Sequence, residues 1–433
     1  MSNVVRLPRP QKDRERAAPL GLYLRVGRDQ HKDLLDVLAQ GEMDFFGLVI
    51  DARYTQRHRE LKTEALRRQL DVVLDPNTHA MATVGGHTAA AASLPWGLSR
   101  PHRADDFAGA AGRERAKKIA QFVVENGFTQ LLGPTHLLSS ANDLWLRRDI
   151  EVMGWVHHEL RQLSPTMPLI YPLAIPVQVF RDAAQRQAII AAIADAPNDA
   201  LWLRIENFGQ DATGEKLAAY IEACADFREL GKPLVADYAG GLAGLGLLAF
   251  GAVGGLAHGI TLFESFKPGG WRRPKPESEQ AGGVSTRVYI QQLDMLLKPK
   301  DARAFLESST RVRTQFGCRN THCCPGGIKD QVDNPTRHYV HTRSEQISKL
   351  SATPLALRVN RYMDDYVRPI SDSVAAVSDF PSISPDLKNV IKRRNKMAGR
   401  FRQAMSHFAQ IYRTPEPLDP PLSRPARETQ HKK

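Results

Sequence analysis

The first 265 residues alternate short apolar segments with longer segments of helical periodicity. Runs that are apolar at nearly every position are typical of strands buried on both faces of a parallel sheet. Eight such runs are predicted as strands, at residues 21–27, 45–53, 70–80, 128–138, 168–176, 200–209, 232–241 and 253–264. The segments between them are predicted as helices, at residues 29–40, 56–69, 114–126, 143–163, 177–194, 214–230 and 242–250.

Eight strands that alternate with helices over about 250 residues are the pattern of a (β/α)8 TIM-like barrel. We predict this α/β barrel for residues 20–266 in preference to an open doubly wound sheet. Residues 267–283 are rich in glycine, proline and charge, and are predicted as a loop or linker. A mostly helical extension is expected over residues 284–413, with helices at 284–297, 299–309 and 344–370. The polar ends, a basic arm at 1–19 and a tail at 414–433, are predicted to be disordered.

Charge suggests a partner for this fold. The chain has 59 Lys and Arg against 47 Asp and Glu, a formal net charge of +12, which favours nucleic acid as a partner and is also compatible with a basic enzyme of another kind. Residues 391–402 contain no acidic side chain, and a phosphate-binding face is predicted there. Its basic residues are Lys392, Arg393, Arg394, Lys396, Arg400 and Arg402.

The chain lacks an uncharged apolar run of the roughly 20 residues that a membrane helix needs, so no membrane partner is expected. Residues 1–19 do not resemble a secretory signal, and we predict a cytoplasmic, reducing location. The sequence does not indicate an oligomeric state.

Polar residues at the carboxyl ends of the predicted strands are the first candidates for chemistry, because these ends meet at the mouth of a barrel. Carboxylates brought together in a cleft repel one another and suit acid, base or nucleophilic roles. The alternative is that they cap helices or pair with Arg25, Arg53 and Arg204. The predicted catalytic residues are Asp75, Asp237, Glu206, Glu264, Asp51 and His136. His258 is a second histidine expected at the mouth and is predicted to bind substrate; it and His136 can each be a proton carrier or a hydrogen-bonded loop residue.

The segment YAGGLAG, residues 238–244, follows the seventh predicted strand. Two glycines after a strand allow backbone amides to approach a ligand closely. The segment can serve as a phosphate cradle, as a site where backbone groups recognise a planar base, or as a tight strand-to-helix turn.

Three of the four cysteines lie within the segment CRNTHCC, at Cys318, Cys323 and Cys324. Thiolates with one imidazole form tetrahedral zinc sites, and His322, His338 and His341 are all near enough in sequence to complete one. A reactive thiol pair and inert buried cysteines are the alternatives. A metal here would have a structural role, because the segment lies outside the predicted barrel.

Together these features resemble the tRNA-guanine transglycosylase family, including its DNA-acting relatives. YAGGLA resembles the segment with which that family meets the exchanged base, and the cysteines followed by His341 resemble its zinc site. The resemblance implies base exchange or cleavage in tRNA or DNA, with Asp75 as base and with Asp237 or Glu264 as nucleophile. It also implies base contacts from Tyr238, Gly240, Gly241, Leu242 and Ala243, and zinc bound by the three cysteines and His341.

Two other functions compete with this one. The first is a barrel lyase or isomerase that acts on a small phosphorylated metabolite. The second is a barrel without catalytic activity that binds nucleic acid or serves in assembly.

Overall fold

The computed structural model describes residues 20–41, 44–274, 286–378, 380 and 384–412. Within them, eight parallel strands form a closed barrel in chain order, with β8 hydrogen-bonded to β1. The strands are β1 (Gly21–Arg25), β2 (Gly47–Asp51), β3 (Asp71–Asp75), β4 (Gln130–Leu132), β5 (Leu169–Pro176), β6 (Ala200–Glu206), β7 (Leu234–Asp237) and β8 (Gly255–Gly259). All eight predicted strands and the predicted (β/α)8 class are therefore confirmed.

Side-chain alternation along the strands sets what fills the barrel. One buried apolar cluster lines the interior and contains Tyr23, Val73, Trp202 and Val235. Side chains two residues further along a strand point to the same face, one layer nearer the carboxyl ends. On β1, β3, β6 and β7 that next residue is charged, so the sequence builds a charged layer directly above an apolar one.

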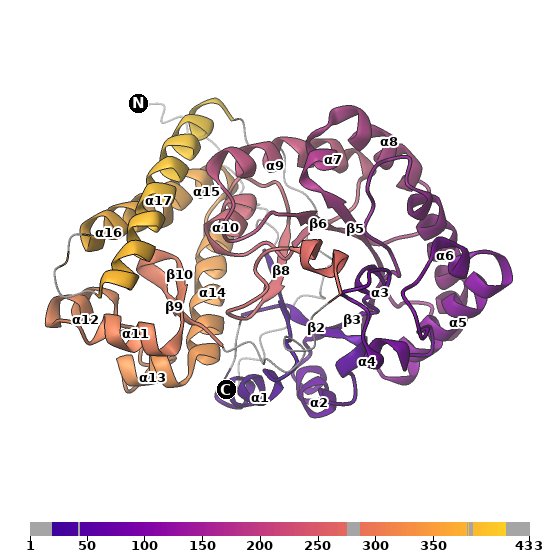
Figure 1. Cartoon of the computed structure of the whole chain (residues 1–433), viewed down its shortest axis with the longest axis horizontal. Coiled ribbons are helices and arrows are strands. Elements are labelled where there is room, and N and C mark those ends of the chain that lie inside the picture. The colour runs from indigo at the N-terminus through magenta and orange to yellow at the C-terminus, as the bar shows by residue number, and fades with distance from the viewer. Residues whose placement is uncertain (1–19, 42–43, 275–285, 379, 381–383, 413–433) are drawn as a thin grey trace, which may run out of the picture.

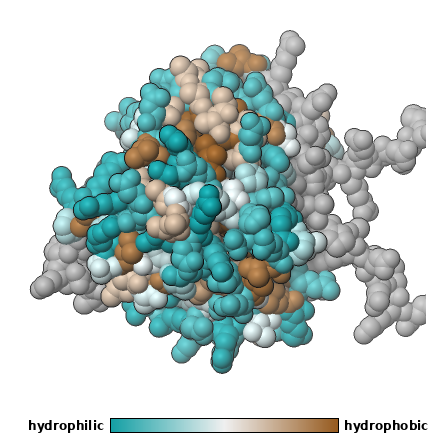
Figure 2. Space-filling view, turned by 90° about the vertical axis from the view of Figure 1, so that its right-hand side faces the viewer, coloured by the Kyte–Doolittle hydropathy of each residue, from teal (hydrophilic) through white to brown (hydrophobic). Residues whose placement is uncertain are grey.

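Helices surround the barrel and bury their apolar faces against the outside of the strands. Those between the strands include α1 (His31–Ala39), α2 (Arg59–Arg67), α5 (Gly109–Glu125), α6 (Leu144–Leu163), α7 (Val177–Arg181), α8 (Ala183–Ile193), α9 (Gly214–Phe227) and α10 (Gly241–Ala249). The loop after β3 adds the short helices α3 (Thr78–Met81), α4 (Ala89–Ala92) and η2 (Ala104–Phe107). Figure 2 shows a mainly hydrophilic surface on the side of the molecule that lies to the right in Figure 1, as expected for amphipathic outer helices.

The extension lies against one side of the barrel (Figure 1). Its helices are α11 (Pro299–Leu306), α12 (Thr310–Phe316), α13 (Ile328–Asp333), α14 (Pro335–Ala352), α15 (Leu355–Tyr362), the π-helix η7 (Met363–Val367), α16 (Arg368–Ser378) and α17 (Pro385–Ile411). Helix α14 contacts α1, α10 and β1, so it occupies the place in the outer ring that follows β8. The extension thus completes the barrel, and α17 packs along α9.

Two predictions for the extension need correction. Residues 284–297 were predicted as a helix, but their described part forms an antiparallel pair, β9 (Val288–Ile290) with β10 (Met295–Leu297). The turn between these strands places Asp294 at φ 44°, and the Tyr289 hydroxyl donates to Asp294 Oδ1 at 2.9 Å. The helix predicted at 344–370 is interrupted at Pro354, because proline removes a backbone donor and clashes with the preceding turn.

The predicted loop at 267–283 begins with a 3-10 helix, η4 (Pro268–Arg272). Residues 275–283 of that loop, the arm at 1–19 and the tail at 414–433 lie outside the described residues. No helix in the described part of the chain combines the length and apolarity that a bilayer span requires.

Candidate active site at the barrel mouth

The charged layer at the mouth consists of two arginines and two aspartates. Asp237 accepts hydrogen bonds from Arg25 Nε and Nη2, both at 2.6 Å, and from Arg204 Nε at 2.7 Å. Asp75 accepts from Arg25 Nη1 at 2.8 Å and from Arg204 Nη2 at 2.7 Å. The four charges cancel, and the side chains of Asp237 and Asp75 are only 0% and 4% exposed. The two aspartates of the predicted site thus meet, and they also form the predicted arginine pairs.

Burial and the arginines shift the pKa of Asp75 in opposite directions. Burial disfavours its ionised form, but the charges of Arg204 and Arg25 outweigh burial and hold the pKa of Asp75 well below its usual range. His79 lies against the same layer, 2.9 Å from Arg204 Nη1. Burial and the Arg204 charge hold the pKa of His79 well below its usual range, so the ring is neutral at pH 7. Asp75 is therefore ionised at neutral pH.

Aromatic rings cover the charged layer. The guanidinium carbon of Arg25 lies 4.2 Å from the centre of the Tyr238 ring, and burial raises the pKa of Tyr238 to about 12. Phe266 packs beside Tyr238 with 5.3 Å between ring centres, and Trp271 packs against both Phe266 and His79. The loop after β8 thereby closes over the mouth, since its Trp271 carbonyl accepts from the backbone of the loop after β3.

Two other predicted acids form ion pairs at the rim. Asp51 binds Arg53, with 2.6 Å between Asp51 Oδ2 and Arg53 Nη2, and also accepts from Asn77 Nδ2 at 2.8 Å. Both carboxylate oxygens of Glu206 accept from Arg272 Nη2, Oε1 at 3.0 Å and Oε2 at 2.9 Å. Arg53 is one of the three arginines that the sequence suggested as partners for these acids.

Glu264 lies under the YAGGLA segment, not in the charged layer. Its Oε2 accepts from the backbone N–H of Gly241 at 2.9 Å, and its carbonyl accepts from Gly240. A Cβ atom at residue 240 would lie 2.1 Å from Glu264 Oε2, so only glycine permits this contact. Burial raises the pKa of Glu264 to about 7 against the opposing charge of Arg343, whose Nη2 lies 3.5 Å away.

This contact gives the segment a definite local structure. Gly241, at φ 62°, begins α10, and the adjacent Leu242 N–H donates to Asp294 Oδ2 at 3.2 Å. Ala243 is buried within α10. Of the three interpretations of YAGGLAG, the tight strand-to-helix turn is therefore observed.

The two predicted mouth histidines are enclosed by protein. His258 Nδ1 lies 2.9 Å from the Gly259 carbonyl, and burial lowers the pKa of His258 to about 3. His136 Nδ1 lies 2.7 Å from Asp149 Oδ1, and its ring stacks on Trp145 with 3.5 Å between centres. The side chains of His136 and Asp149 are each 1% exposed, so this pair links the loop after β4 to α6 in the core.

The cysteines form a cluster with one histidine. Cys318, Cys323, Cys324 and His338 place their ligand atoms within 4.8 Å of one another. Cys318 and Cys323 sulfurs are 3.4 Å apart, and His338 Nδ1 lies 3.5 Å from Cys324 Sγ. A tetrahedral zinc with bonds of about 2.1–2.3 Å places its ligand atoms roughly 3.5–3.8 Å apart, so the four groups fit such an ion.

The predicted fourth ligand, His341, is replaced by His338. Both lie on α14, but His341 lies about 4.5 Å further along the helix axis and about 60° around it, and only His338 reaches the sulfurs. His338 Nε2 lies 3.0 Å from the Tyr289 carbonyl, an outer contact of the kind that orients metal-binding histidines. A metal held by these four residues would join the loop at 318–324 to α14.

The predicted phosphate-binding residues all lie on α17, but they differ in availability. Arg394 binds Asp294 at 2.8 Å and is nearly buried, and Arg402 pairs with Asp372. The exposed members are Lys392, Arg393, Lys396 and Arg400.

Comparisons with known proteins add little to this geometry. No family model matches the chain, and no curated protein matches it. A thiamine phosphate pyrophosphorylase from Pyrococcus furiosus is 10% identical over 57% of this chain and 88% of its own, with a TM-score of 0.28. A GH18 chitinase from Pseudoalteromonas aurantia is 12% identical over 55% and 93%, with a TM-score of 0.34. Amy13B from Eubacterium rectale is 10% identical over 56% and 66%, with a TM-score of 0.35.

Likenesses this low carry no argument about function. The fold assignment rests on the strand topology, and the resemblance to tRNA-guanine transglycosylases stays a prediction.

Proposed function

We propose that the protein is a transglycosylase-like enzyme that exchanges or cleaves a base in tRNA or DNA. The observation that carries this proposal is the carboxylate pair at the mouth, in which the same two arginines bind both Asp75 and Asp237. Glycosyl transfer typically uses two carboxylates, one of which can attack the anomeric carbon.

In this proposal Asp237 is the nucleophile. Its carboxylate forms a bond to C1′ of the nucleotide while the bond from C1′ to the base breaks, and the base leaves with the electron pair. An incoming base, or water in the cleavage reaction, then displaces the carboxylate. Asp75, which its lowered pKa keeps ionised at neutral pH, takes the proton that this incoming group releases, and it becomes a stronger base when a hydrogen bond from Arg25 or Arg204 opens.

The arginines impose a condition on this chemistry. Asp237 is saturated by hydrogen bonds from Arg25 and Arg204, so a substrate reaches it only when at least one of these bonds opens. The turn at Gly240 and Gly241 follows Tyr238 closely, and in this proposal its backbone borders the bound base. The exposed basic residues of α17 would bind the phosphate backbone.

The experiment measures incorporation of a labelled base into tRNA and into DNA by the purified protein. Asp237→Asn and Asp75→Asn should each lower incorporation by at least about a hundredfold, as expected for loss of a nucleophile or a base. Glu151→Gln, on the outer face of α6, is the matched control for carboxylate loss. Wild-type exchange that persists in both mouth variants would refute the proposal.

A further inference from the structure

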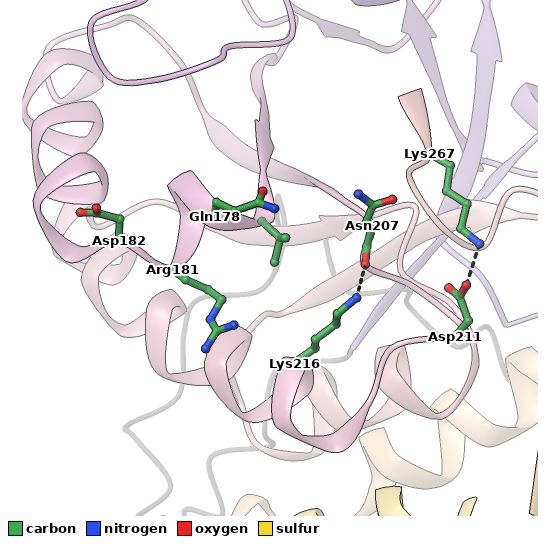
Figure 3. A pocket seen from close by; sticks show the side chains of 8 residues that line it. Gln178, Arg181, Asp182, Asn207, Asp211, Lys216 and Lys267 are labelled. Carbon is green, nitrogen blue, oxygen red and sulfur yellow. Dashed lines mark hydrogen bonds and ion pairs between the residues drawn. The ribbon is translucent and has the colours of Figure 1, made fainter. Parts of the chain in front are cut away.

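A separate cavity lies beside the mouth, and nothing described so far uses it. Its volume is about 820 Å³, within the range of small-molecule sites. The residues that line it follow the carboxyl ends of β5, β6 and β8, and they include Gln178, Arg181, Asn207, Lys216 and Lys267. Figure 3 shows the cationic ends of Arg181 and Lys216 directed into the space between these elements.

Two of the three cations are available to a ligand. Lys267 is held by Asp211, with 2.6 Å from Nζ to Oδ2. Among the described residues, the polar contact of Lys216 Nζ is with the Asn207 carbonyl, at 3.4 Å. Arg181 is exposed and forms no ion pair or side-chain hydrogen bond with any residue in the described part of the chain.

The acids of the cavity do not neutralise this pair. Asp211 is shared between Lys267 and the Ser265 hydroxyl, the latter at 2.9 Å. Asp182 caps α8 by accepting from Gln185 N at 3.0 Å, and Figure 3 shows its carboxylate at the far edge, directed away from Lys216. Arg181 and Lys216 therefore remain without an ion-pair partner among the described residues.

The remaining lining groups suit the same kind of ligand. Gln178 and Asn207 add side-chain amides, and in Figure 3 both amides lie on the side of the cavity opposite Arg181 and Lys216. Amide donors with a guanidinium and an ammonium group are a common set for phosphoryl oxygens.

The cavity is coupled to the mouth by backbone contacts. Asn207 follows Glu206 and donates its N–H to the Phe266 carbonyl at 2.8 Å. The Phe266 ring packs on Tyr238, above the charged layer. A ligand group in the cavity would therefore lie one side-chain layer from the mouth.

We propose that this cavity binds a phosphate group of the ligand whose reacting part occupies the mouth, with Arg181 and Lys216 as its principal contacts. The phosphate can be a diester of a nucleic acid strand or a monoester of a small metabolite. The binding chemistry is shared, and it does not depend on base exchange.

The test compares the double variant R181A/K216A with the control R147A/K329A, which removes the same charge from exposed positions elsewhere. Two probes report the source of the phosphate. Fluorescence anisotropy measures the binding of a labelled single-stranded oligonucleotide at several salt concentrations. Calorimetry measures the binding of ribose 5-phosphate and, for comparison, of ribose.

R181A/K216A should weaken one probe by about tenfold, as expected for two charge-assisted contacts at an exposed site, and the control should change it by less than about twofold. An effect on the oligonucleotide, with a salt slope reduced by about 0.7 per lost contact, identifies a diester. An effect confined to ribose 5-phosphate identifies a monoester. Equal weakening by both double variants, no weakening by either, or no wild-type binding of either probe would overturn the proposal.

The results for the Asp237 and R181A/K216A variants distinguish failure of the phosphate site from failure of the proposed base exchange. If base exchange depends on Asp237 but not on Arg181 and Lys216, and R181A/K216A binds both probes as the wild type does, the proposed function stands and the phosphate site in the cavity is refuted. Probe binding that depends on Arg181 and Lys216 without any exchange would do the reverse.

Discussion

Replacing Asp237 by asparagine tests the charged layer directly, because this carboxylate is fully buried and accepts three hydrogen bonds from two arginines. The variant leaves Arg25 and Arg204 with Asp75 alone, a net positive charge in the barrel. Breaking a buried ion pair in this way costs about 3–5 kcal/mol. With an unfolding entropy of about 2.1 cal/mol/K per residue, a chain of 433 residues has roughly 0.9 kcal/mol/K. The melting temperature should therefore fall by about 3–6 °C.

Differential scanning fluorimetry measures this shift, and a double-mutant cycle assigns its cause. Adding Arg204→Gln to Asp237→Asn restores the charge balance, so the double variant should be more stable than the sum of the single effects by about 1–3 kcal/mol. Glu151→Gln breaks an exposed pair with Arg147 and a partly buried pair with Arg148, both on α6, and should change stability by less than about 1 kcal/mol. A melting temperature for Asp237→Asn equal to that of Glu151→Gln would refute the reasoning.

Three further predictions concern other parts of the molecule. Because folding raises the pKa of Glu264 from 4.5 to about 7, the folded state favours the neutral form, and the unfolding free energy should fall by about 3 kcal/mol between pH 4.5 and 7. Urea titrations should show this fall reduced in Glu264→Gln. Elemental analysis should find zinc lowered by His338→Ala and retained by His341→Ala. Lys396→Glu with Arg400→Glu should weaken oligonucleotide binding and reduce its salt slope, measured by anisotropy.

Each of these predictions has a result that contradicts it. Parallel pH profiles for wild type and Glu264→Gln would show that Glu264 does not hold its proton in the folded state. Zinc lost from His341→Ala but not from His338→Ala would reverse the ligand assignment. Arg147→Glu with Lys329→Glu changes the net charge by the same amount and is the control for the α17 variant. An equal loss of binding in both would attribute the effect to net charge alone.

The barrel could be predicted from sequence because its information is local. Each strand is a short apolar run, and each following helix has its own periodicity, so eight repeats define the class. Asp75 and Asp237 were also visible, because both end such runs. Their arginine partners, Arg25 and Arg204, follow from the same alternation, since each lies two residues beyond an interior aromatic residue.

Other parts of the site depend on contacts that sequence does not reveal. Arg343 reaches Glu264 from α14, far along the chain, and no local pattern marks that approach. Trp271 and Arg272 lie in a segment whose composition indicates only a loop. The choice of His338 over His341 depends on the orientation of α14. The β9–β10 pair consists of two three-residue strands, too short for alternation to identify.

The contact between Gly240 and Glu264 also links two positions during sequence divergence. A side chain at residue 240 would overlap the carboxylate, which lies 2.1 Å from the place of its Cβ atom. A shorter residue at 264 would remove the overlap but leave the Gly241 N–H without its acceptor. A side chain at residue 240 should therefore be tolerated only together with a shorter residue at 264, and a library randomised at both positions should recover the two changes together.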